Sequence, residues 1–215
     1  MTTRQNTQQG FTLVEIAIVL VIIGLLLGGI LKGQEMITQA KIKNVIADFS
    51  GVSAAYNGYQ DRYRALPGDD KNATARWGGA QGDGSGVVNG TYNSTTADVE
   101  SRLWWDHLRK AGFIAGTGQT QPTNAVSGTV GVETGDGAAT PGPAMSGMTS
   151  LMMCSSNLPD KIAIAVDNQM DDGQSNAGTV RSKLQAAAGS PAVDNTVTSA
   201  YQETGTNVYL LCRSM

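Results

Sequence analysis

The sequence predicts an α+β protein in which one long N-terminal helix supports a head built from a small antiparallel sheet and short helices. Three observations lead to this fold. A polar leader is followed by an apolar run from Ile16 to Leu31, an amphipathic pattern continues from there to Tyr63, and the remaining chain is rich in glycine and low in charge. Glycine contributes 27 of the 215 residues and charged residues only 15%, a composition typical of a head with many turns.

The N-terminal helix is expected to run from Phe11 to Tyr63. Its first half, residues 11–33, is apolar on every side, and about 20 such residues can cross the ~30 Å hydrocarbon core of a bilayer. Its second half, residues 34–65, carries apolar residues at spacings of three and four, which predicts one buried face. The members of this stripe are Ile42, Val45, Ile46, Phe49, Val52, Tyr56, Tyr59 and Tyr63. The globular head then comprises residues 66–215.

Glycines interrupt the apolar half of this helix at positions 24, 28, 29 and 33. One interpretation is close packing between helices, because Gly24 and Gly28 form a small-xxx-small pair. The other is local melting of the helix on assembly, because each glycine costs about 1 kcal/mol relative to alanine in a helix interior. The residues leave both interpretations open.

Glu15 is the only ionisable residue between Gly10 and Lys32. A carboxylate in an apolar segment of this kind is costly, and by default it marks a functional site with a partner. If the chain is cleaved after Gly10, the new amino group of Phe11 lies about one helical turn from Glu15. Phe11 and Glu15 are therefore the candidate assembly residues.

These residues resemble the leader junction of type IV pilins and type II secretion pseudopilins. The resemblance rests on Gly10, Phe11, Thr12, Leu13 and Glu15 and covers about the first 35 residues. It implies that a prepilin peptidase removes the leader, residues 1–10, by cleaving between Gly10 and Phe11, and methylates the new amino group of Phe11. It also implies that Glu15 pairs with the amino terminus of a neighbouring subunit. A generic signal anchor is the alternative interpretation of the segment.

The resemblance implies a structural subunit of a type IV pilus, a fimbrium, or of a related filament. The precursor is then expected in the inner membrane and the processed chain in an extracellular homopolymer, with the peptidase and the inner-membrane assembly machinery as partners. A major pilin, a minor pilin, a type II secretion pseudopilin and a tip pilin that binds a ligand or DNA all fit. Adhesion, motility and secretion are open roles. Many type IV pilins carry a proline near the point where their helix melts, and this chain has Lys32 at that position. The residue that usually accompanies helix melting is therefore absent here.

Charge and side-chain inventory argue against other classes of function. The net charge of −3 and the pI near 5.1 predict no broad basic surface, so nucleic acid is not an expected partner. His107 is the only histidine, which excludes histidine-based triads and multi-histidine metal sites within one chain. No nucleophile with a base and an orienting group can be recognised. We therefore expect no enzymatic activity and, calcium apart, no cofactor.

The two cysteines, Cys154 and Cys212, are far apart in the sequence. In an exported head they are expected to form a disulfide that closes a long loop, as in many type IV pilins. On the chain-entropy model such a bond contributes ~4 kcal/mol to stability. Two reduced, buried thiols are the alternative.

Turn and cap signals divide the head into short elements. The stretch 66–68, Leu-Pro-Gly, ends the long helix. A second helix is expected over residues 97–111, with Thr96 as its N-cap, and a third from Pro159 to Met170, with the proline in its first turn. Strands are expected at Val126–Val132, Met148–Cys154 and Asn207–Leu211. The glycine-rich residues 82–86 lack the ligands of an EF-hand and predict a plain turn.

The densest cluster of oxygen ligands in the chain follows the third helix and consists of Asp167, Asn168, Asp171 and Asp172. Ca²⁺ prefers carboxylate, amide and carbonyl oxygens, and water can complete its coordination shell. Some pseudopilins hold calcium in the head, so this cluster is a candidate calcium site. The alternative is that these are simply solvated acidic residues at the end of a helix.

Overall fold

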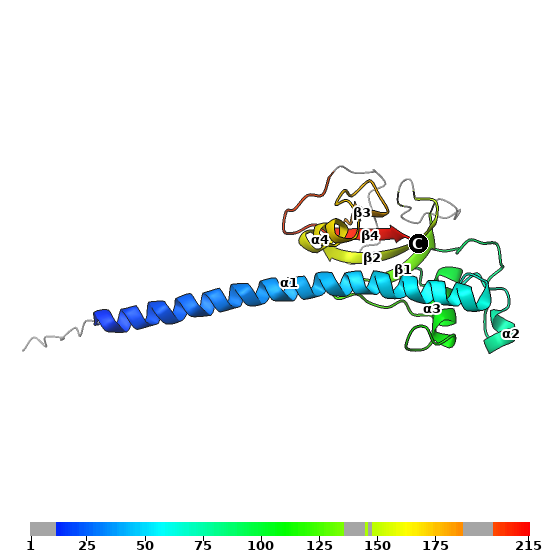
Figure 1. The fold of residues 1–215 in the computed structure, drawn as a ribbon, viewed down its shortest axis with the longest axis horizontal. Helices are drawn as coiled ribbons and strands as arrows, with labels where there is room; N and C mark the ends of the chain where they lie inside the picture. The colour runs from blue at the N-terminus through cyan, green and yellow to red at the C-terminus, as the bar shows by residue number, and fades with distance from the viewer. Residues whose placement is uncertain (1–11, 136–144, 146–147, 187–199) are drawn as a thin grey trace, which may run out of the picture. The chain divides into compact units, whose positions relative to one another are not determined.

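The structure is a computed structural model that describes residues 12–135, 145, 148–186 and 200–215. The chain forms two compact units, Met1–Ala40 and Lys41–Met215. Helix α1 (Leu13–Tyr63) contributes residues to both units, and every other helix and strand belongs to the second (Figure 1). The predicted start of this helix at Phe11 lies outside the described residues, and its predicted end at Tyr63 is confirmed.

In the first unit, α1 is a continuous helix that exposes its apolar side chains. Leu13 is 89% exposed and Leu31 is 67% exposed, and the large residues between them are also exposed. Within the described residues, α1 alone is long and apolar enough to cross a membrane. The helix passes through all four glycines of this segment without a break.

In the second unit, the amphipathic stripe of α1 lies in the hydrophobic core, as predicted. Val45, Phe49 and Tyr59 are fully buried, and the other members of the stripe are buried or packed against the core. Ala55, which was not predicted, is also buried. It belongs to the same face because it lies three residues after Val52. This face sets the position of the head elements that pack on it.

The sheet has four antiparallel strands in the order β1-β2-β4-β3. Helix α3 (Glu100–Lys110) packs against β1, and α4 (Asp160–Met170) packs against the other three strands (Figure 1). The short helix α2 (Ala73–Trp77) lies between α1 and α3 in the sequence. The strands are β1 (Val130–Thr134), β2 (Leu151–Pro159), β3 (Val180–Leu184) and β4 (Val208–Ser214).

The predicted disulfide between Cys154 and Cys212 is confirmed. The two cysteines are register partners on β2 and β4, so the bond links the two central strands of the sheet directly. Both are fully buried, in a cluster with Met145, Met148 and Met152. Because the cysteines are 58 residues apart, the bond restricts a long stretch of the unfolded chain.

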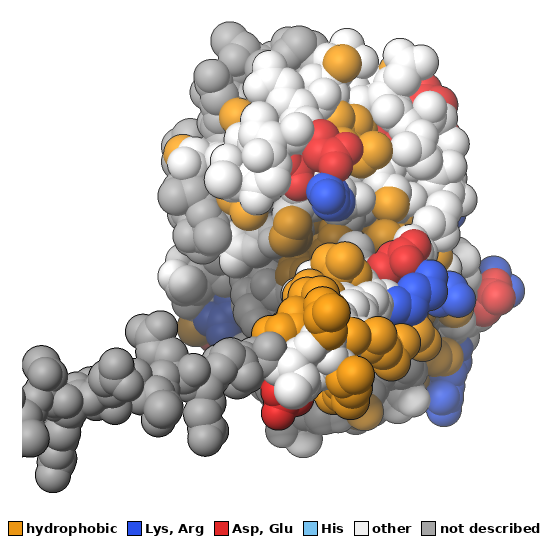
Figure 2. Space-filling view, turned by 90° about the vertical axis from the view of Figure 1, so that its left-hand side faces the viewer, with side chains coloured by type: hydrophobic (Ala, Val, Ile, Leu, Met, Phe, Trp, Pro, Cys, Tyr) orange, Lys and Arg blue, Asp and Glu red, His pale blue; other side chains and the backbone are white. Residues whose placement is uncertain are grey.

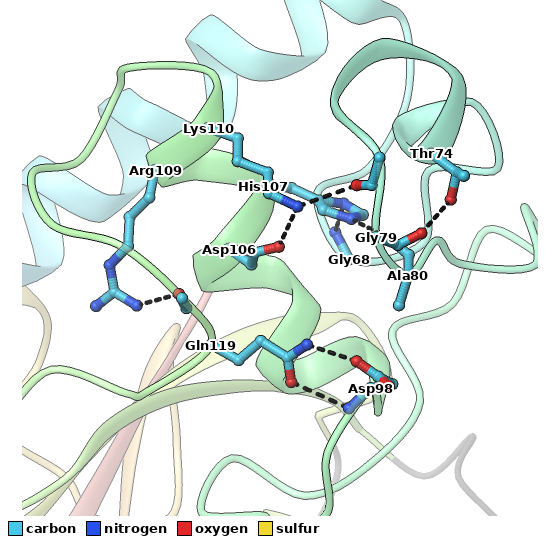
Figure 3. A network of polar contacts seen from close by, with 12 residues as sticks. Gly68, Thr74, Gly79, Ala80, Asp98, Asp106, His107, Arg109, Lys110 and Gln119 are labelled. Carbon is cyan, nitrogen blue, oxygen red and sulfur yellow. Dashed lines mark hydrogen bonds and ion pairs between the residues drawn. The ribbon is translucent and has the colours of Figure 1, made fainter.

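Helix α3 begins at Glu100, three residues later than predicted, and Thr96 is not its N-cap. The N-cap is Val99 in an extended conformation, preceded by Asp98 with a positive φ of 60°. Asp98 is held by Gln119 through two hydrogen bonds (Figure 3): its amide donates to Gln119 Oε1 at 3.0 Å, and Gln119 Nε2 donates to Asp98 Oδ1 at 2.6 Å. A partner 21 residues away therefore overrides the local capping signal.

The predicted strand Val126–Val132 begins too early, because a turn occupies its first half. Asn124 Oδ1 accepts hydrogen bonds from the amides of Val126 and Gly128, and Ser127 has a positive φ of 62°. These contacts hold the chain in a turn, and β1 starts only at Val130.

The other predicted strands and the third predicted helix are present with shifted bounds, whereas helix α2 was not predicted. The strand expected at Met148–Cys154 is β2 at Leu151–Pro159, and the one expected at Asn207–Leu211 is β4 at Val208–Ser214. Pro159 is the N-cap of α4 and does not lie in its first turn. Strand β3 was not predicted, because it is short and carries Arg181 and Lys183 among its five residues.

The turn after α1 is tied back to the helix through buried Asp70. Its Oδ2 accepts a hydrogen bond from Tyr59 Oη at 2.7 Å and forms an ion pair with Arg76. Its Oδ1 accepts the amide of Asn72 at 2.9 Å. Because Asp70 is only 1% exposed, each of these donors compensates for the burial of a charge.

We predict that Tyr59→Phe lowers the free energy of unfolding by about 1–3 kcal/mol, because it removes a buried hydrogen bond to an ionised carboxylate while keeping the ring. Tyr63→Phe is the matched control, since among the described residues the Tyr63 hydroxyl has no hydrogen bond. Urea unfolding of the two variants in detergent, followed by tryptophan fluorescence, measures the difference. Equal stability of the two variants would contradict the prediction.

Glu133 on β1 is a second buried carboxyl group, with 4% of its surface exposed. Its Oε2 accepts a hydrogen bond from the amide of Tyr92 at 3.0 Å. Burial raises the pKa of Glu133 to about 7, against the lowering effects of the Tyr92 amide and the Lys183 charge. The folded protein therefore holds a proton at Glu133 that the unfolded chain releases near pH 4.5.

We predict that the free energy of unfolding falls as the pH rises from about 4.5 to about 7. Over that range the folded state holds a proton at Glu133 that the unfolded state has already released. The loss at Glu133 amounts to at most ~3 kcal/mol. Unfolding measured across this range should show a shallower decline in Glu133→Gln than in the unmodified protein. Parallel pH profiles for the two proteins would contradict the prediction.

Candidate functional sites: the N-terminal motif and the acidic clusters of the head

The first turn of α1 is closed by reciprocal hydrogen bonds between Thr12 and Glu15. Glu15 Oε2 accepts from the Thr12 amide at 2.8 Å and from Thr12 Oγ1 at 2.9 Å, and Thr12 Oγ1 accepts from the Glu15 amide at 3.3 Å. This arrangement is a capping box, in which a threonine N-cap and a glutamate three residues later satisfy each other's backbone donors. This capping box was not predicted, although the spacing Thr-x-x-Glu is its usual signal.

The capping box uses only one of the two carboxylate oxygens. Among the described residues, the hydrogen bonds to Glu15 all end at Oε2, while a carboxylate offers about four lone-pair sites on its two oxygens. Glu15 can therefore cap its own helix and accept a charged donor from another chain at the same time. Gly10 and Phe11, the predicted processing residues, lie outside the described residues.

The helix around this cap presents a wide apolar surface. Figure 2 shows hydrophobic side chains gathered over this part of α1. An added Cβ at any of the four glycines, positions 24, 28, 29 and 33, would meet no atom of this chain within 4 Å. Packing within the chain therefore does not require these glycines, and their small size leaves room for another helix to approach closely.

The structure brings together three of the four residues predicted as calcium ligands. Asp167, Asp171 and Asp172 each offer a carboxylate oxygen, and these atoms lie within 4.8 Å of one another. Asp171 Oδ2 accepts the amides of Thr179 at 2.5 Å and Val180 at 2.9 Å, which ties the loop after α4 to the start of β3. These contacts place the cluster at the junction of a helix and a strand.

Asp167 differs from its neighbours because it is fully buried. Its Oδ2 accepts a hydrogen bond from Tyr201 Oη at 2.6 Å, and its Oδ1 is buried without a hydrogen bond in the described structure. The pKa of Asp167 is raised to about 6, mainly by burial and also by the charges of Asp172 and Asp171, while the Tyr201 hydrogen bond and the Gly173 amide act to lower it. The fold therefore keeps this carboxylate buried at a cost.

Asn168, the fourth predicted ligand, has an exposed side chain that lies against the turn after α4. A Cβ added at Gly173 would come within 2.0 Å of Asn168 Oδ1. Gly173 also has a positive φ of 75°, so the turn needs glycine for both reasons. The close packing indicates that Asn168 shapes the turn, and its role as an ion ligand stays a prediction.

A second acidic cluster, which the sequence analysis did not identify, holds the glycine-rich loop. Buried Asp69 accepts hydrogen bonds through its side chain from the amides of Gly84 at 2.6 Å, Ser85 at 3.0 Å and Gly86 at 2.7 Å. Three backbone donors converge on this one carboxylate and fix the loop. The predicted plain turn is thus a loop clamped by a residue that lies 15 positions earlier.

Glu100, the first residue of α3, holds one residue of this loop and a second residue just after it. Its carboxylate accepts the amide of Asp83 at 3.1 Å and the amide of Asn89 at 2.8 Å. Asp69, Asp83 and Glu100 offer carboxylate oxygens within 4.8 Å of one another. Burial raises the pKa of Glu100, and the two amides lower it. The donors that reach this cluster are backbone amides, which gives it a structural role.

His107, the only histidine, is also structural (Figure 3). Its Nδ1 accepts a hydrogen bond from the Gly68 amide at 3.0 Å, and its Nε2 faces the carbonyl oxygen of Ala80 at 3.4 Å. Burial lowers the pKa of His107, in keeping with a neutral ring that accepts at one nitrogen and donates at the other. Both ring nitrogens are thus directed at backbone groups of the segment between α1 and α3, one on each side of α2.

Comparison with known proteins addresses the N-terminal motif directly. Residues 5–31 match the family model described as the prokaryotic N-terminal methylation motif, which confirms the predicted prepilin-type motif. Among solved structures, the chain is similar to the major type IV pilin PilA1 from Clostridium difficile, with 13% sequence identity and a TM-score of 0.37 over 81% of this chain and 96% of that one. No curated protein sequence matches the chain.

Proposed function

We propose that this chain is a structural subunit of a type IV pilus or a related extracellular filament, processed by a prepilin peptidase after Gly10 and assembled by packing of α1. The observation that carries the proposal is the prepilin-type motif at residues 5–31, which leads into a helix whose apolar residues are exposed. The motif supplies the processing signal, and the helix supplies the surface that assembly has to cover.

The exposed apolar residues of α1 must be shielded from water both in the membrane-bound precursor and in the assembled filament. A soluble monomer rarely exposes a contiguous apolar patch larger than a few hundred Å². In the precursor this cover is the lipid of the inner membrane, because the segment is long enough to cross it. In a filament the cover is the α1 helices of neighbouring subunits, and the four glycines permit their close approach.

Glu15 provides the specificity that apolar packing lacks. A charge in an apolar environment is strongly disfavoured unless it is paired. Within the described part of the chain, the hydrogen bonds to Glu15 end at Oε2, and Oε1 can accept the amino group that processing creates at Phe11 of a neighbouring subunit. Pairing of the two charges would favour one register of the subunits over the others.

The second unit fits a head carried outside the cytoplasm. Its two central strands are joined by the buried disulfide, and disulfides persist in oxidising compartments. The carboxylates of Asp69 and Glu100 and the ring of His107 contact backbone groups of the head. These features support a structural role.

Mass spectrometry of filaments sheared from the cell surface tests the proposal. We predict that the chain occurs there with a methylated Phe11 at its start. High abundance would identify a major pilin, and a processed chain confined to the inner membrane would identify a minor pilin or a type II secretion pseudopilin. A chain that still begins at Met1 would contradict the proposal. Salt-dependent binding of DNA by the purified chain would favour a ligand-binding tip pilin.

We predict that Glu15→Ala leaves membrane insertion intact and lowers the yield of filaments at least tenfold. The amino group of each neighbouring subunit would then be buried without a partner, which typically costs ~3–5 kcal/mol. Glu35→Ala is the matched control, since Glu35 lies on the same helix and forms an exposed ion pair with Lys32. Normal filament yield from Glu15→Ala, measured by immunoblot of the sheared fraction, would rule out the pairing.

A further inference from the structure

A cavity of about 270 Å³ lies where α1 ends and the chain turns into the head. Its lining includes Tyr63, the three residues that follow it and part of the glycine-rich loop. A second cavity, of about 380 Å³, shares Arg64, Ala65 and Leu66 with the first, so the two adjoin. Both volumes lie near the lower end of the ~300–1,000 Å³ range of small-molecule sites.

Polar side chains without partners gather at the first cavity. In the part of the chain that the structure describes, the side chains of Arg64, Lys71 and Asn72 make no hydrogen bond or ion pair. All three residues are exposed. The stem of Lys71 lies against the glycine-rich loop, because a Cβ added at Gly84 would come within 3.1 Å of Lys71 Cδ. The cavity thus presents two cations and an amide to solvent.

The carboxylates at the same cavity are compensated within the fold. Asp69 accepts the amides of three loop residues, and Asp70 pairs with Arg76 and accepts the Tyr59 hydroxyl. The positive charges of Arg64 and Lys71 have no such partner in the described residues. The cavity is therefore suited to an anionic group, and a guanidinium can hold a carboxylate through two parallel hydrogen bonds.

Arg64 occupies its position at a conformational cost. Its amide donates to the carbonyl oxygen of Gln60 at 2.8 Å, and its φ of 53° lies in the left-handed region. This position after a helix usually carries glycine, which has no Cβ to strain the backbone. A positive charge near the helix end is already supplied by Arg62 in the last turn. The turn itself therefore does not explain why an arginine is present at residue 64.

We propose that these adjoining cavities bind an acidic sugar, a hexuronate, whose carboxylate lies between Arg64 and Lys71. The hydroxyls of a sugar both donate and accept hydrogen bonds. Asn72 provides donors and an acceptor in the first cavity, and the exposed carboxylate of Asp61 provides acceptors in the second.

This lining favours a sugar over a bare anion or a phosphodiester. Asp61 repels a second negative charge but accepts hydroxyl groups, so a ligand with one anionic group and several hydroxyls fits the residues best. Half-buried Ala65 and Leu66 offer apolar surface to the C–H groups of a sugar ring. A small inorganic anion would use the cations and leave these other contacts unmade.

Ligand-observed NMR of the full chain in detergent tests the site, with sodium glucuronate as the probe. Glucose, acetate and inorganic phosphate are the comparison ligands. We expect glucuronate to bind roughly tenfold more tightly than glucose, which lacks the carboxylate, because one charge-assisted hydrogen bond is worth about that factor. Acetate and phosphate should bind more weakly than glucuronate as well, because they lack the ring hydroxyls.

Arg64→Gly removes the cation and keeps the backbone of the turn. Its Tm should stay close to that of the unmodified chain, because glycine adopts a positive φ without strain. We expect its affinity for glucuronate to fall roughly tenfold. Arg62→Ala is the matched control, since Arg62 is an exposed cation at the same helix end and does not line either cavity. Its affinity should change less than about twofold.

Three outcomes would overturn the proposal. They are no binding of glucuronate to the unmodified chain at about 20 mM, binding of acetate or phosphate as tight as that of glucuronate, and equal affinities for Arg64→Gly and Arg62→Ala. The chain is tested in detergent without filaments, so the result does not depend on the proposed assembly.

Discussion

The burial of one face of α1 is the constraint on which the rest of the head depends. Residues from Ile42 to Tyr59 supply that face, and the tryptophans of α3 belong to the same core. Tyr56 stacks on Trp104 with ring centroids 5.3 Å apart, and Tyr59 reaches past the core to Asp70. The helix thus organises an apolar core and, at its end, the polar contacts that turn the chain into the head.

Buried and half-buried carboxylates hold much of the head's irregular backbone in place. Long connections leave backbone amides without partners in a helix or sheet, and a buried amide needs an acceptor. Asp69 and Glu100 accept the amides of the glycine-rich loop, and Asp171 accepts those before β3. Fixed acceptors of this kind let a glycine-rich head keep one defined structure.

Glu15 combines a structural and a functional task within one carboxylate. Its bonds to Thr12 stabilise the first turn of α1, and in the proposed filament its second oxygen accepts the amino group of a neighbouring subunit. In the proposed filament, the first turn of α1 is ordered before assembly, and the charge of Glu15 still selects the position of a neighbouring subunit. An alanine at this position would remove both contributions, whereas the Glu35–Lys32 pair concerns only the helix surface.

The sequence by itself determined the features that arise from near neighbours in the chain: the apolar and amphipathic halves of α1, the prepilin-type motif and the helical character of α3 and α4. Periodicity and short motifs encode these, because the residues involved lie within a few turns of one another.

Only the tertiary structure decided three other features. These are the start of α3, which depends on the contact of Gln119 with Asp98, the hydrogen bonds of Asp69 to its loop, and the strand β3. The acidic residues after α4 were visible in the sequence, but the burial of Asp167 was not, since Tyr201 reaches it from 34 residues away. Such contacts depend on which segments the folded core brings together, and no local pattern carries that information.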